Sequence, residues 1–337
     1  MRRKPGIVVL TGASAGVGRA TAAVLAKRGC KVGLIARGAE PLEETRAMVA
    51  AAGGEAIALP LDVADAAAVD AAAEQVETRL GPIDTWINAA MVTVFSPVSE
   101  MTAEEFRRVT EVTYLGTVNG TLAALKRMRQ RDYGTIVQVG SALSYRAIPL
   151  QSAYCGAKFA IRGFTDALRS ELIHGGSRIR LSMVQLPGLN TPQFEWARNH
   201  LPQRPRPVAP VYQPEVAARA IVRAAEEAPR ELWVGGSSVQ AILGAMVLPG
   251  LLDRLLAARA YSGQQTGEPA LERADNLETS YPGKHRAHGR FGRHARTRAI
   301  RLSSGTVRAA LLGTAGATML ATSVLAAHGR RARLEKR

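Results

Sequence analysis

The sequence has few cysteines and few aromatic residues. Its 337 residues include two cysteines, Cys30 and Cys155, and only 5% are Phe, Trp or Tyr. Two cysteines make no disulfide framework, which excludes small disulfide-bonded secreted domains and favours a reducing compartment. The apolar run that follows the basic N-terminus stops at Thr11, so it is too short for a secretion signal. We therefore expect a cytoplasmic protein with an aliphatic core.

Positive charge is concentrated at one end of the chain. Residues 284–337 carry 13 Lys and Arg and one acid, a charge of +12, which leaves +4 for residues 1–283. The tail lacks the interleaved aromatic residues of a nucleic-acid-binding segment. Among its histidines, the cluster His285, His288 and His294 has no Cys or acidic companions to complete a metal site. We expect a solvated basic segment, no metal, and no nucleic-acid partner.

Short β-rich runs alternate with longer helical ones, which is typical of a parallel sheet covered on both faces. We expect an α/β fold of the doubly wound (Rossmann) type, with a mostly parallel seven-stranded sheet and helices on both faces. The expected strands span residues 7–10, 31–36, 56–59, 83–87, 135–139, 179–186 and 231–234.

The pattern changes after the last expected strand. We expect a nucleotide-binding catalytic domain over residues 1–240, an additional helix over 241–262, interrupted at Pro249, and an irregular basic linker over 263–305. Within residues 306–337, the uncharged run 309–329 is about long enough to span a bilayer. A membrane anchor bound to anionic lipid and a soluble terminal helix are equally compatible with this run.

A glycine-rich stretch follows the first expected strand. Residues 11–19 read Thr-Gly-Ala-Ser-Ala-Gly-Val-Gly-Arg, with glycines at 12, 16 and 18. Such glycines let the backbone approach a pyrophosphate at the N-terminus of the next helix, where free N–H groups attract an anion. A plain glycine-rich turn is the alternative. The position at the first strand-to-helix junction favours a dinucleotide site.

Tyr154 and Lys158 are four residues apart in an expected helix, which stacks them on one face. An ammonium favours the phenolate, so we expect the pKa of Tyr154 to move from about 10 toward neutrality. A solvated lysine beside a half-buried ring is the alternative. Ser141 precedes Tyr154 by thirteen residues and ends an expected strand, where open parallel sheets bind ligands.

These motifs, in this order and at these spacings, resemble a classical short-chain dehydrogenase/reductase over about residues 5–240. The resemblance implies an enzyme acting on CH–OH groups with NAD(P). In it Tyr154 transfers the hydroxyl proton, Ser141 hydrogen-bonds the substrate oxygen, and Lys158 lowers the tyrosine pKa and binds the nicotinamide ribose. The cofactor contacts that it implies are Gly12, Ser14, Ala15, Gly16, Val17, Gly18, Asp62, Val63, Asn88, Tyr154, Lys158, Pro187, Gly188, Leu189 and Thr191.

Cofactor preference is expected to depend on the end of the second strand. An acid here would bind the ribose 2′-OH of NAD, whereas Arg37 offers a fork suited to the 2′-phosphate of NADP. We predict NADP (NADPH) over NAD, with a solvent-facing arginine as the alternative. The resemblance places Asp62 at the adenine amino group, although Asp62 could also cap the next helix.

Two positions depart from the family pattern. Ala90 stands where the family has a glycine beside the cofactor. Thr113 stands where the family has an asparagine whose bent helix holds a water in the proton relay behind Lys158. A threonine can bond back to its own helix and bend it. Asn119, six residues on, points elsewhere on a regular helix.

The segment between Thr191 and Tyr212 corresponds to the family's lid over the substrate. Its Phe194, Trp196 and Tyr212 could line an apolar pocket or simply pack the lid onto the body. We predict an NADP-dependent oxidoreductase that interconverts a carbonyl and a secondary alcohol on an apolar small molecule. The alternative is a catalytically weakened NADP-binding scaffold acting at the membrane. The resemblance also implies a homodimer or homotetramer through helices within residues 102–129 and 153–174.

Overall fold

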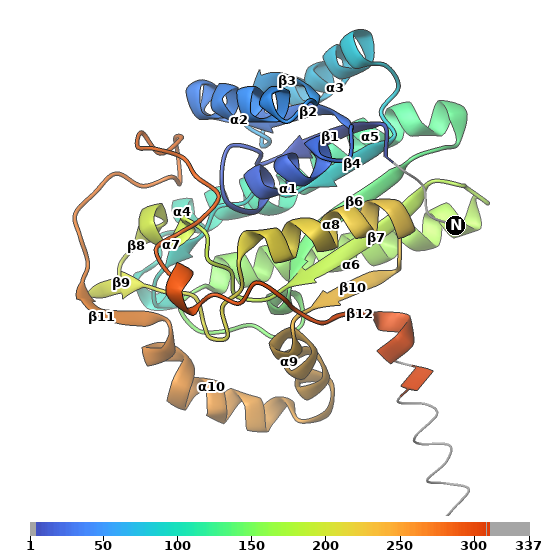
Figure 1. Ribbon diagram of the computed structural model, residues 1–337. Coiled ribbons are helices and arrows are strands. Elements are labelled where there is room, and N and C mark those ends of the chain that lie inside the picture. The colour runs from blue at the N-terminus through green and yellow to red at the C-terminus, as the bar shows by residue number, and fades with distance from the viewer. Residues whose placement is uncertain (1–4, 308, 311–337) are drawn as a thin grey trace, which may run out of the picture.

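The computed structural model describes residues 5–307, 309 and 310. An eight-stranded sheet runs through the molecule in the order β12-β10-β7-β6-β4-β1-β2-β3 (Figure 1). Its strands are β1 (Ile7–Thr11), β2 (Lys31–Ala36), β3 (Glu55–Pro60), β4 (Thr85–Asn88), β6 (Thr135–Ser141), β7 (Arg180–Leu186), β10 (Glu231–Val234) and β12 (Arg301–Ser303). The first seven match the predicted strands to within two residues at each end, and all of them are parallel.

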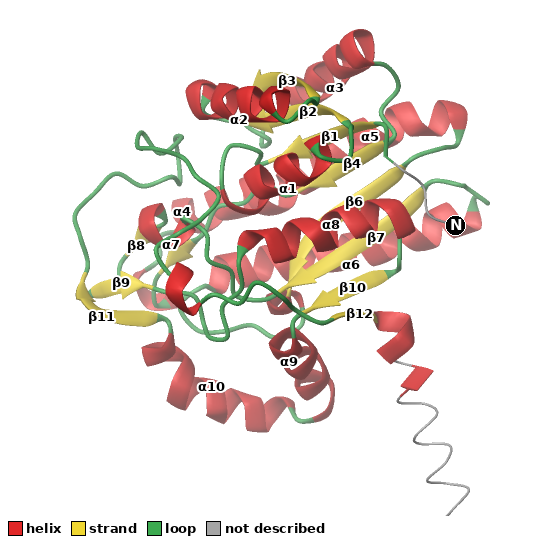
Figure 2. Cartoon of the chain, viewed as in Figure 1, coloured by secondary structure: helices red, strands yellow, loops and turns green. Residues whose placement is uncertain are grey.

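Helices cover both faces of the sheet (Figure 2). Helices α1 (Gly16–Ala26), α2 (Ala39–Ala51) and α8 (Pro214–Glu227) pack on one face. On the other face lie α3 (Ala66–Leu80), α5 (Gly116–Arg131) and α6 (Ser152–His174). The short α4 (Ala103–Val109) and a π-helix, Thr110–Leu115, precede α5. The doubly wound α/β fold is therefore confirmed.

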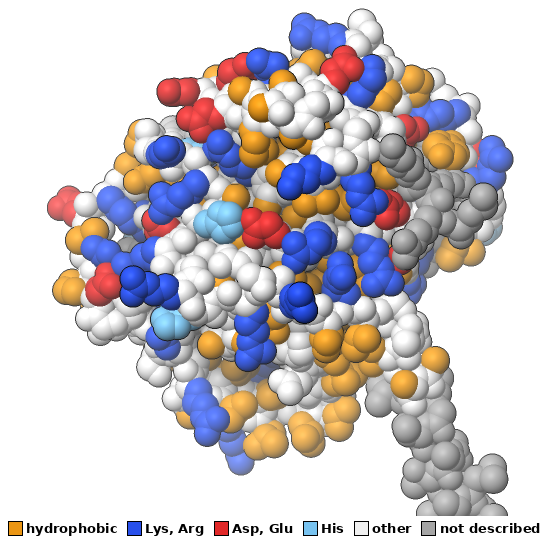
Figure 3. Space-filling model, in the orientation of Figure 1, with side chains coloured by type: hydrophobic (Ala, Val, Ile, Leu, Met, Phe, Trp, Pro, Cys, Tyr) orange, Lys and Arg blue, Asp and Glu red, His pale blue; other side chains and the backbone are white. Residues whose placement is uncertain are grey.

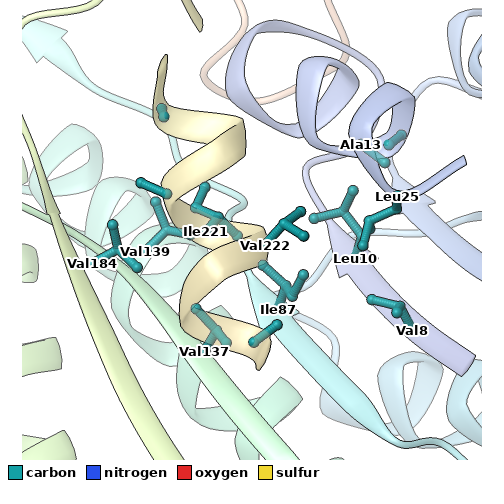
Figure 4. Packing of buried hydrophobic residues seen from close by; sticks show 14 of the residues in the cluster. Val8, Leu10, Ala13, Leu25, Ile87, Val137, Val139, Val184, Ile221 and Val222 are labelled. Atoms are coloured by element: carbon teal, nitrogen blue, oxygen red, sulfur yellow. The ribbon is translucent and has the colours of Figure 1, made fainter. Parts of the chain in front are cut away.

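Two hydrophobic cores lie on opposite faces of the sheet. In β1, Val8 and Leu10 belong to one core and Val9 to the other, because successive side chains of a strand point to opposite faces. Figure 4 shows Val8 and Leu10 beside Ile87, against residues of α8. Burial on both sides explains why the strands read as continuous apolar runs rather than as alternating ones.

The chain beyond β10 is helical and breaks at Pro249, as predicted, but it starts earlier than the expected helix. It forms two helices, α9 (Gly236–Val247) and α10 (Pro249–Gly263), because Pro249 has no N–H to continue α9. None of the helices in residues 5–307 and 309–310 combines the length and apolarity needed to cross a bilayer. Apart from Ala309 and Ala310, the uncharged run 309–329 lies outside the described residues.

The expected linker packs against the catalytic domain. Residues 264–303, which we call the strap, begin with β11 (Gln265–Pro269), which pairs with β9 (Gln203–Pro205). They end with β12, an eighth strand that runs antiparallel to β10. Between the two, the strap is irregular, as predicted, and crosses the face that carries α7 (Gln193–Trp196) and α8 (Figure 1).

Candidate active site

A cavity of about 400 Å³ opens at the carboxyl ends of the central strands. It is lined by the glycine turn after β1, by Ser141 at the end of β6, and by Tyr154 and Lys158 on α6. The loop after β7 contributes Pro187, Gly188, Leu189 and Thr191. Elements far apart in sequence therefore bring most of the predicted site residues to one cavity, because all parallel strands end at the same edge.

The glycine turn has the geometry of a nucleotide cradle. Gly12 has a φ of +70°, and a Cβ there would lie 2.8 Å from the Cα of Ala90. A Cβ on Gly18 would lie 1.9 Å from the carbonyl oxygen of Gly12. The turn can therefore close tightly only with glycine at both positions. Gly16 opens α1, and residues 14–18 line the cavity at the N-terminus of this helix, so the residues present fit a bound pyrophosphate.

Ser141 rather than Ser144 faces the cavity. The Ser141 hydroxyl accepts a hydrogen bond from the N–H of Leu143 at 3.1 Å, and Ser141 lines the cavity together with Tyr154. Ser144 is fully buried, and its hydroxyl accepts from the N–H of Ser141 at 3.2 Å. Ser144 therefore holds the short 3-10 turn after β6 and presents Ser141.

Tyr154 and Lys158 lie one helical turn apart on α6. The Lys158 ammonium nitrogen lies 5.5 Å from the centroid of the Tyr154 ring and donates to the carbonyl of Val139 at 2.7 Å. Lys158 is 3% exposed. A buried cation with one carbonyl partner and a facing aromatic ring is the arrangement that the four-residue spacing predicts.

The direction of the tyrosine pKa is opposite to the one we expected. Burial raises the pKa of Tyr154, with a smaller opposing effect from the Ser141 hydrogen bond. Burial also lowers the pKa of Lys158, to about 7. Desolvation disfavours the charged form of each group and outweighs their mutual effect. The neighbouring Cys155 is buried and its pKa is raised to about 11, also by burial, in keeping with a core residue.

Thr113 is fully buried in the π-helix. Its hydroxyl accepts from the N–H of Val92 at 3.2 Å and donates to the carbonyl of Val92 at 3.1 Å. The Thr113 hydroxyl therefore ties the π-helical turn to Val92 and does not bond back to its own helix, as we had considered. Asn119 donates to the carbonyl of Val63 at 2.9 Å, away from the cavity, as predicted.

Asn88 lies inside the fold rather than on the cavity. Its amide donates to Gln138 at 2.9 Å and to Thr121 at 3.1 Å, and its oxygen accepts from Trp86 at 2.8 Å. The cavity wall at this place is formed by Ala89 and Ala90, whose N–H groups both donate to the hydroxyl of Thr11, at 3.0 and 3.1 Å. Asn88 thus ties β4 to its neighbours and does not line the cavity, unlike the cofactor contact that the resemblance implied.

Asp62 and Val63 line the cavity after β3. One Asp62 oxygen accepts from the N–H of Ala64 at 3.0 Å, and the other binds the guanidinium of Arg108. The cap of α3 is Asp65, whose carboxylate accepts from the N–H of Ala68. The capping alternative for Asp62 is therefore wrong, because the helix begins one residue after Asp65.

Arg37 lines the cavity but is not free in solvent. Its guanidinium donates to the carbonyls of Leu277 at 3.0 Å, of Glu278 at 2.9 Å and of Asn276. Within the described part of the chain, these bonds use three of the five N–H donors of a guanidinium. The partners lie about 240 positions away in the strap, so no local pattern could reveal them.

The aromatic residues of the lid divide between the two roles considered. Phe194 and Trp196 line the cavity, whereas Tyr212 is 3% exposed and belongs to the main core. Tyr212 exchanges main-chain hydrogen bonds with Gly188 at 3.0 Å and Asn190 at 2.8 Å, so it fixes the loop after β7. A Cβ on Gly188 would lie 2.6 Å from the carbonyl oxygen of Val208, which explains the glycine.

Sequence reasoning missed the strap's contribution to this cavity. Asn276, Ser280, Tyr281 and His285 all line it. The rings of Tyr281 and His285 lie 5.1 and 5.0 Å from the ring of Trp196. The only available signal was a pair of rings, Tyr281 and His285, spaced four residues apart within a basic and otherwise irregular stretch. No three His, Cys, Asp or Glu side chains of the described residues are grouped as a metal site.

Comparison with known proteins identifies the class. The chain belongs to the short-chain dehydrogenase family, whose model (short chain dehydrogenase) matches residues 6–201. It is therefore an NAD(P)-dependent oxidoreductase that acts on CH–OH groups.

Three relatives illustrate the family's range. The chain is 34% identical over 276 residues to the uncharacterized oxidoreductase YxnA of Bacillus subtilis (strain 168), covering 81% of this chain and 77% of that protein. It is 30% identical over 256 residues to the ketoacyl reductase HetN of a Nostoc species, covering 74% and 87%. The human dehydrogenase/reductase SDR family member 7 matches 49% of this chain and 50% of its own length at 35% identity.

Proposed function

We propose that the protein interconverts a carbonyl and a secondary alcohol by hydride transfer, with NADP as cofactor and Tyr154 as general acid and base. The proposal is carried by one observation: Ser141, Tyr154 and Lys158 meet at the same cavity as the glycine turn. The bound nicotinamide supplies or accepts the hydride. The chain's own residues hold the substrate oxygen and move its proton.

The oxygen of the substrate would accept from the hydroxyls of Ser141 and Tyr154. The two residues line the same cavity, and Ser141 acts on the Tyr154 phenol by lowering its pKa, so the two hydroxyls can serve one oxygen together. Donors placed where negative charge develops stabilise the transition state without reorganisation. Because burial raises the pKa of Tyr154, its protonated form prevails, and this is the form that donates a proton during carbonyl reduction.

Lys158 would act behind the tyrosine. Its ammonium stands against the tyrosine ring and holds the carbonyl of Val139. A lysine whose pKa is lowered to about 7 can both carry charge and pass a proton near neutral pH. In the family resemblance it also binds the ribose hydroxyls of the nicotinamide nucleotide, and we carry this role over to Lys158.

The preference for NADP rests on Arg37. It lines the cavity, and two of its N–H donors are not used by the strap carbonyls. An arginine fork binds phosphate more strongly than it binds a ribose hydroxyl. There is no acid at residue 36 or 37 to favour the 2′-OH of NAD.

The substrate is proposed to be apolar. The cavity beside Ser141 is lined by hydrophobic side chains from four parts of the chain, namely Met91, Val92, Leu143, Ile148, Phe194, Val208 and Leu256. Apolar pockets with a few polar groups bind ligands by burial and orient them by hydrogen bonds. Ser141 and Tyr154 supply the orienting groups here.

A homodimer or homotetramer is proposed through α4, α5 and α6. Four large apolar side chains on this side of the protein are 41–56% exposed, namely Phe106, Leu115, Leu122 and Phe159. Exposed apolar surface of this kind is typical of a protein interface.

Peripheral association with a membrane stays a proposal for the basic C-terminal end. Figure 3 also shows hydrophobic side chains gathered over α9 and α10, where Val247 and Leu251 are 71 and 61% exposed.

The rival proposal is a cofactor-binding scaffold with weak turnover, acting at a membrane. The buried Thr113 hydroxyl favours it, because both of its hydrogen bonds go to Val92 and neither is available to a relay water. In that case a Thr113→Asn variant gains activity. A screen of apolar ketones and secondary alcohols with NADPH and NADH separates the two proposals. Turnover supports the enzyme, whereas cofactor binding without turnover across the panel supports the scaffold.

A further inference from the structure

We infer that the strap, residues 264–303, is part of the cofactor site: it closes over the adenosine and phosphate half of bound NAD(P), and it must lift for the cofactor to leave. This inference rests on the proposed function in one respect, that the cavity binds the dinucleotide. It assigns a role to a segment that lies beyond the short-chain dehydrogenase match, which ends at residue 201.

The strap is anchored at the adenosine end of the cavity. Arg37 binds three of its consecutive carbonyls, from Asn276 to Glu278, and Arg108 donates to the carbonyl of Leu277 at 3.2 Å. The Leu277 side chain is fully buried and belongs to the core on the face of the sheet that carries α3, α5 and α6. The buried Leu277 side chain and the hydrogen bonds from Arg37 and Arg108 to the neighbouring carbonyls together hold the strap against the body beside the cavity.

The strap next crosses the glycine turn. The N–H of Gly16 donates to the carbonyl of Arg286 at 3.0 Å, and Arg19 donates to the carbonyl of His285 at 2.8 Å. The His285 ring lies 3.3 Å from the hydroxyl of Ser14. The strap is thus in hydrogen-bond contact with the residues that the family uses for the cofactor's phosphates.

A second anchor holds the strap beyond the turn. Asn190 accepts from the N–H of Gly289 at 3.1 Å through its carbonyl and from the N–H of Phe291 at 2.9 Å through its side chain. The Phe291 ring packs on that of Phe194, with centroids 5.9 Å apart. Asn190 lies in the loop after β7, next to the residues that face the nicotinamide in the family. The strap therefore joins both ends of the cofactor site.

The strap forms a wall and does not fill the site. Asn276, Ser280, Tyr281 and His285 line the cavity, which keeps its volume of about 400 Å³ beneath them. The half of the strap that crosses the glycine turn is basic, because residues 284–303 contain seven Lys and Arg and no acid, whereas residues 264–283 contain one Arg and four acids. Figure 3 shows Lys and Arg side chains spread over the face that the strap crosses. Arg286 and Arg290 pair with the carboxylates of Glu195 and Glu268, so part of the positive charge that suggested a solvated tail holds the strap in place.

Amide hydrogen exchange of the full-length protein tests closure without any substitution. The N–H groups of Asn276, Gly289 and Arg296 each donate to a carbonyl of the body, of Trp196, Asn190 and Val211. If the strap closes over the cofactor, saturating NADPH slows exchange in peptides from residues 270–300 by at least about tenfold. Faster exchange with NADPH would mean that the strap and the cofactor compete, and would overturn the inference.

A pair of leucine variants tests the release step. NADPH dissociation is measured by stopped flow, from the loss of NADPH fluorescence on mixing with excess NADP⁺. Leu277→Ala removes the buried anchor and leaves a cavity in the core, which weakens the attachment of the strap to the body. NADPH release should therefore be at least about tenfold faster. Leu271→Ala is the matched control, since Leu271 lies in the same strap and is 56% exposed; its release rate should equal that of the wild type.

The outcomes separate the strap from the proposed function. Equal release rates for Leu277→Ala and the wild type, with both proteins folded, would refute the strap's role and leave the enzyme assignment untouched. Failure of the wild type to bind NADPH or NADH would instead refute the proposed function. Should Leu277→Ala not fold, the exchange measurement on the wild-type protein still decides the matter.

Discussion

Gly18→Ala should damage both the fold and the cofactor site. A Cβ at this position would lie 1.9 Å from the carbonyl oxygen of Gly12 and 2.6 Å from its carbonyl carbon. Real Cβ atoms do not approach so closely, so α1 must move away from the glycine turn. Gly12 cannot yield easily toward β4, because there is not even room for a Cβ between it and Ala90, whose Cα would lie 2.8 Å away. We expect a loss of about 2–4 kcal/mol in the free energy of unfolding, in the range of other overpacked sites.

Gly163→Ala is the matched control for this substitution. Gly163 is also a helical glycine, in α6, but a Cβ there would meet nothing within 4 Å. In an open helical position alanine stabilises by about 0.5–1 kcal/mol, since it has less backbone entropy to lose. The two variants therefore carry the same chemical change in opposite environments, and their stabilities should move in opposite directions.

Urea unfolding followed by circular dichroism gives the stabilities, and fluorescence titration gives the NADPH affinities. Gly18→Ala should bind NADPH at least about tenfold more weakly under conditions where it is folded, because the helix N-terminus that faces the pyrophosphate has moved. Gly163→Ala should bind as the wild type does. A Gly18→Ala protein with wild-type stability and affinity would refute the argument that the turn closes directly on the helix.

Three further outcomes are expected. Carbonyl reduction should slow as the pH rises through about 7, because Lys158 with its lowered pKa loses its ammonium charge there, and Lys158→Arg should abolish this decrease in rate. The free energy of unfolding should rise between pH 7 and 10, because in this range the lysine binds its proton only in the unfolded protein. A pH-independent rate would contradict the role of the ammonium. Thr113→Val should lower the free energy of unfolding in urea by about 1–3 kcal/mol, because it leaves the N–H and carbonyl of buried Val92 without their Thr113 partner. Thr110→Val is the control: it loses only a bond to the Phe106 carbonyl of its own helix and should cost less than about 1 kcal/mol. Arg37→Ala should weaken binding of NADPH about 10–100-fold and of NADH by less, because the lost charge-assisted bond is specific to the phosphate; equal losses for both would show that Arg37 only anchors the strap.

The parts of the fold that could be predicted have local causes. Seven strands are visible in the sequence because each is a short apolar run buried on both faces. The glycine turn and the Tyr154–Lys158 pair are visible because a turn and a helix fix which residues meet. The thirteen-residue spacing favours Ser141 over Ser144 as the serine that faces the cavity. The structure gives the reason, because the Ser144 hydroxyl accepts a hydrogen bond within the turn after β6.

The parts that could not be predicted depend on distant partners. Arg37 reads as a free phosphate ligand until residues 276–278 are brought beside it by the strap. The strap itself has no periodicity, because many of its main-chain groups bind to the body, while the 3-10 turn Gly292–His294 is a single short turn within it. The pKa of Tyr154 was predicted in the wrong direction because a four-residue spacing gives the proximity of a charge but not the depth at which both groups are buried.

Removal of the Tyr154 hydroxyl tests most directly the central claim, that this tyrosine is the general acid and base. Tyr154→Phe removes the proposed acid and keeps the ring that faces Lys158, so cofactor affinity should stay within about threefold of the wild type. With a ketone that the wild type reduces, single-turnover oxidation of NADPH should slow by at least about a hundredfold, the usual contribution of a general acid or base. Wild-type turnover by Tyr154→Phe would contradict the assignment of this tyrosine and, with it, the proposed mechanism.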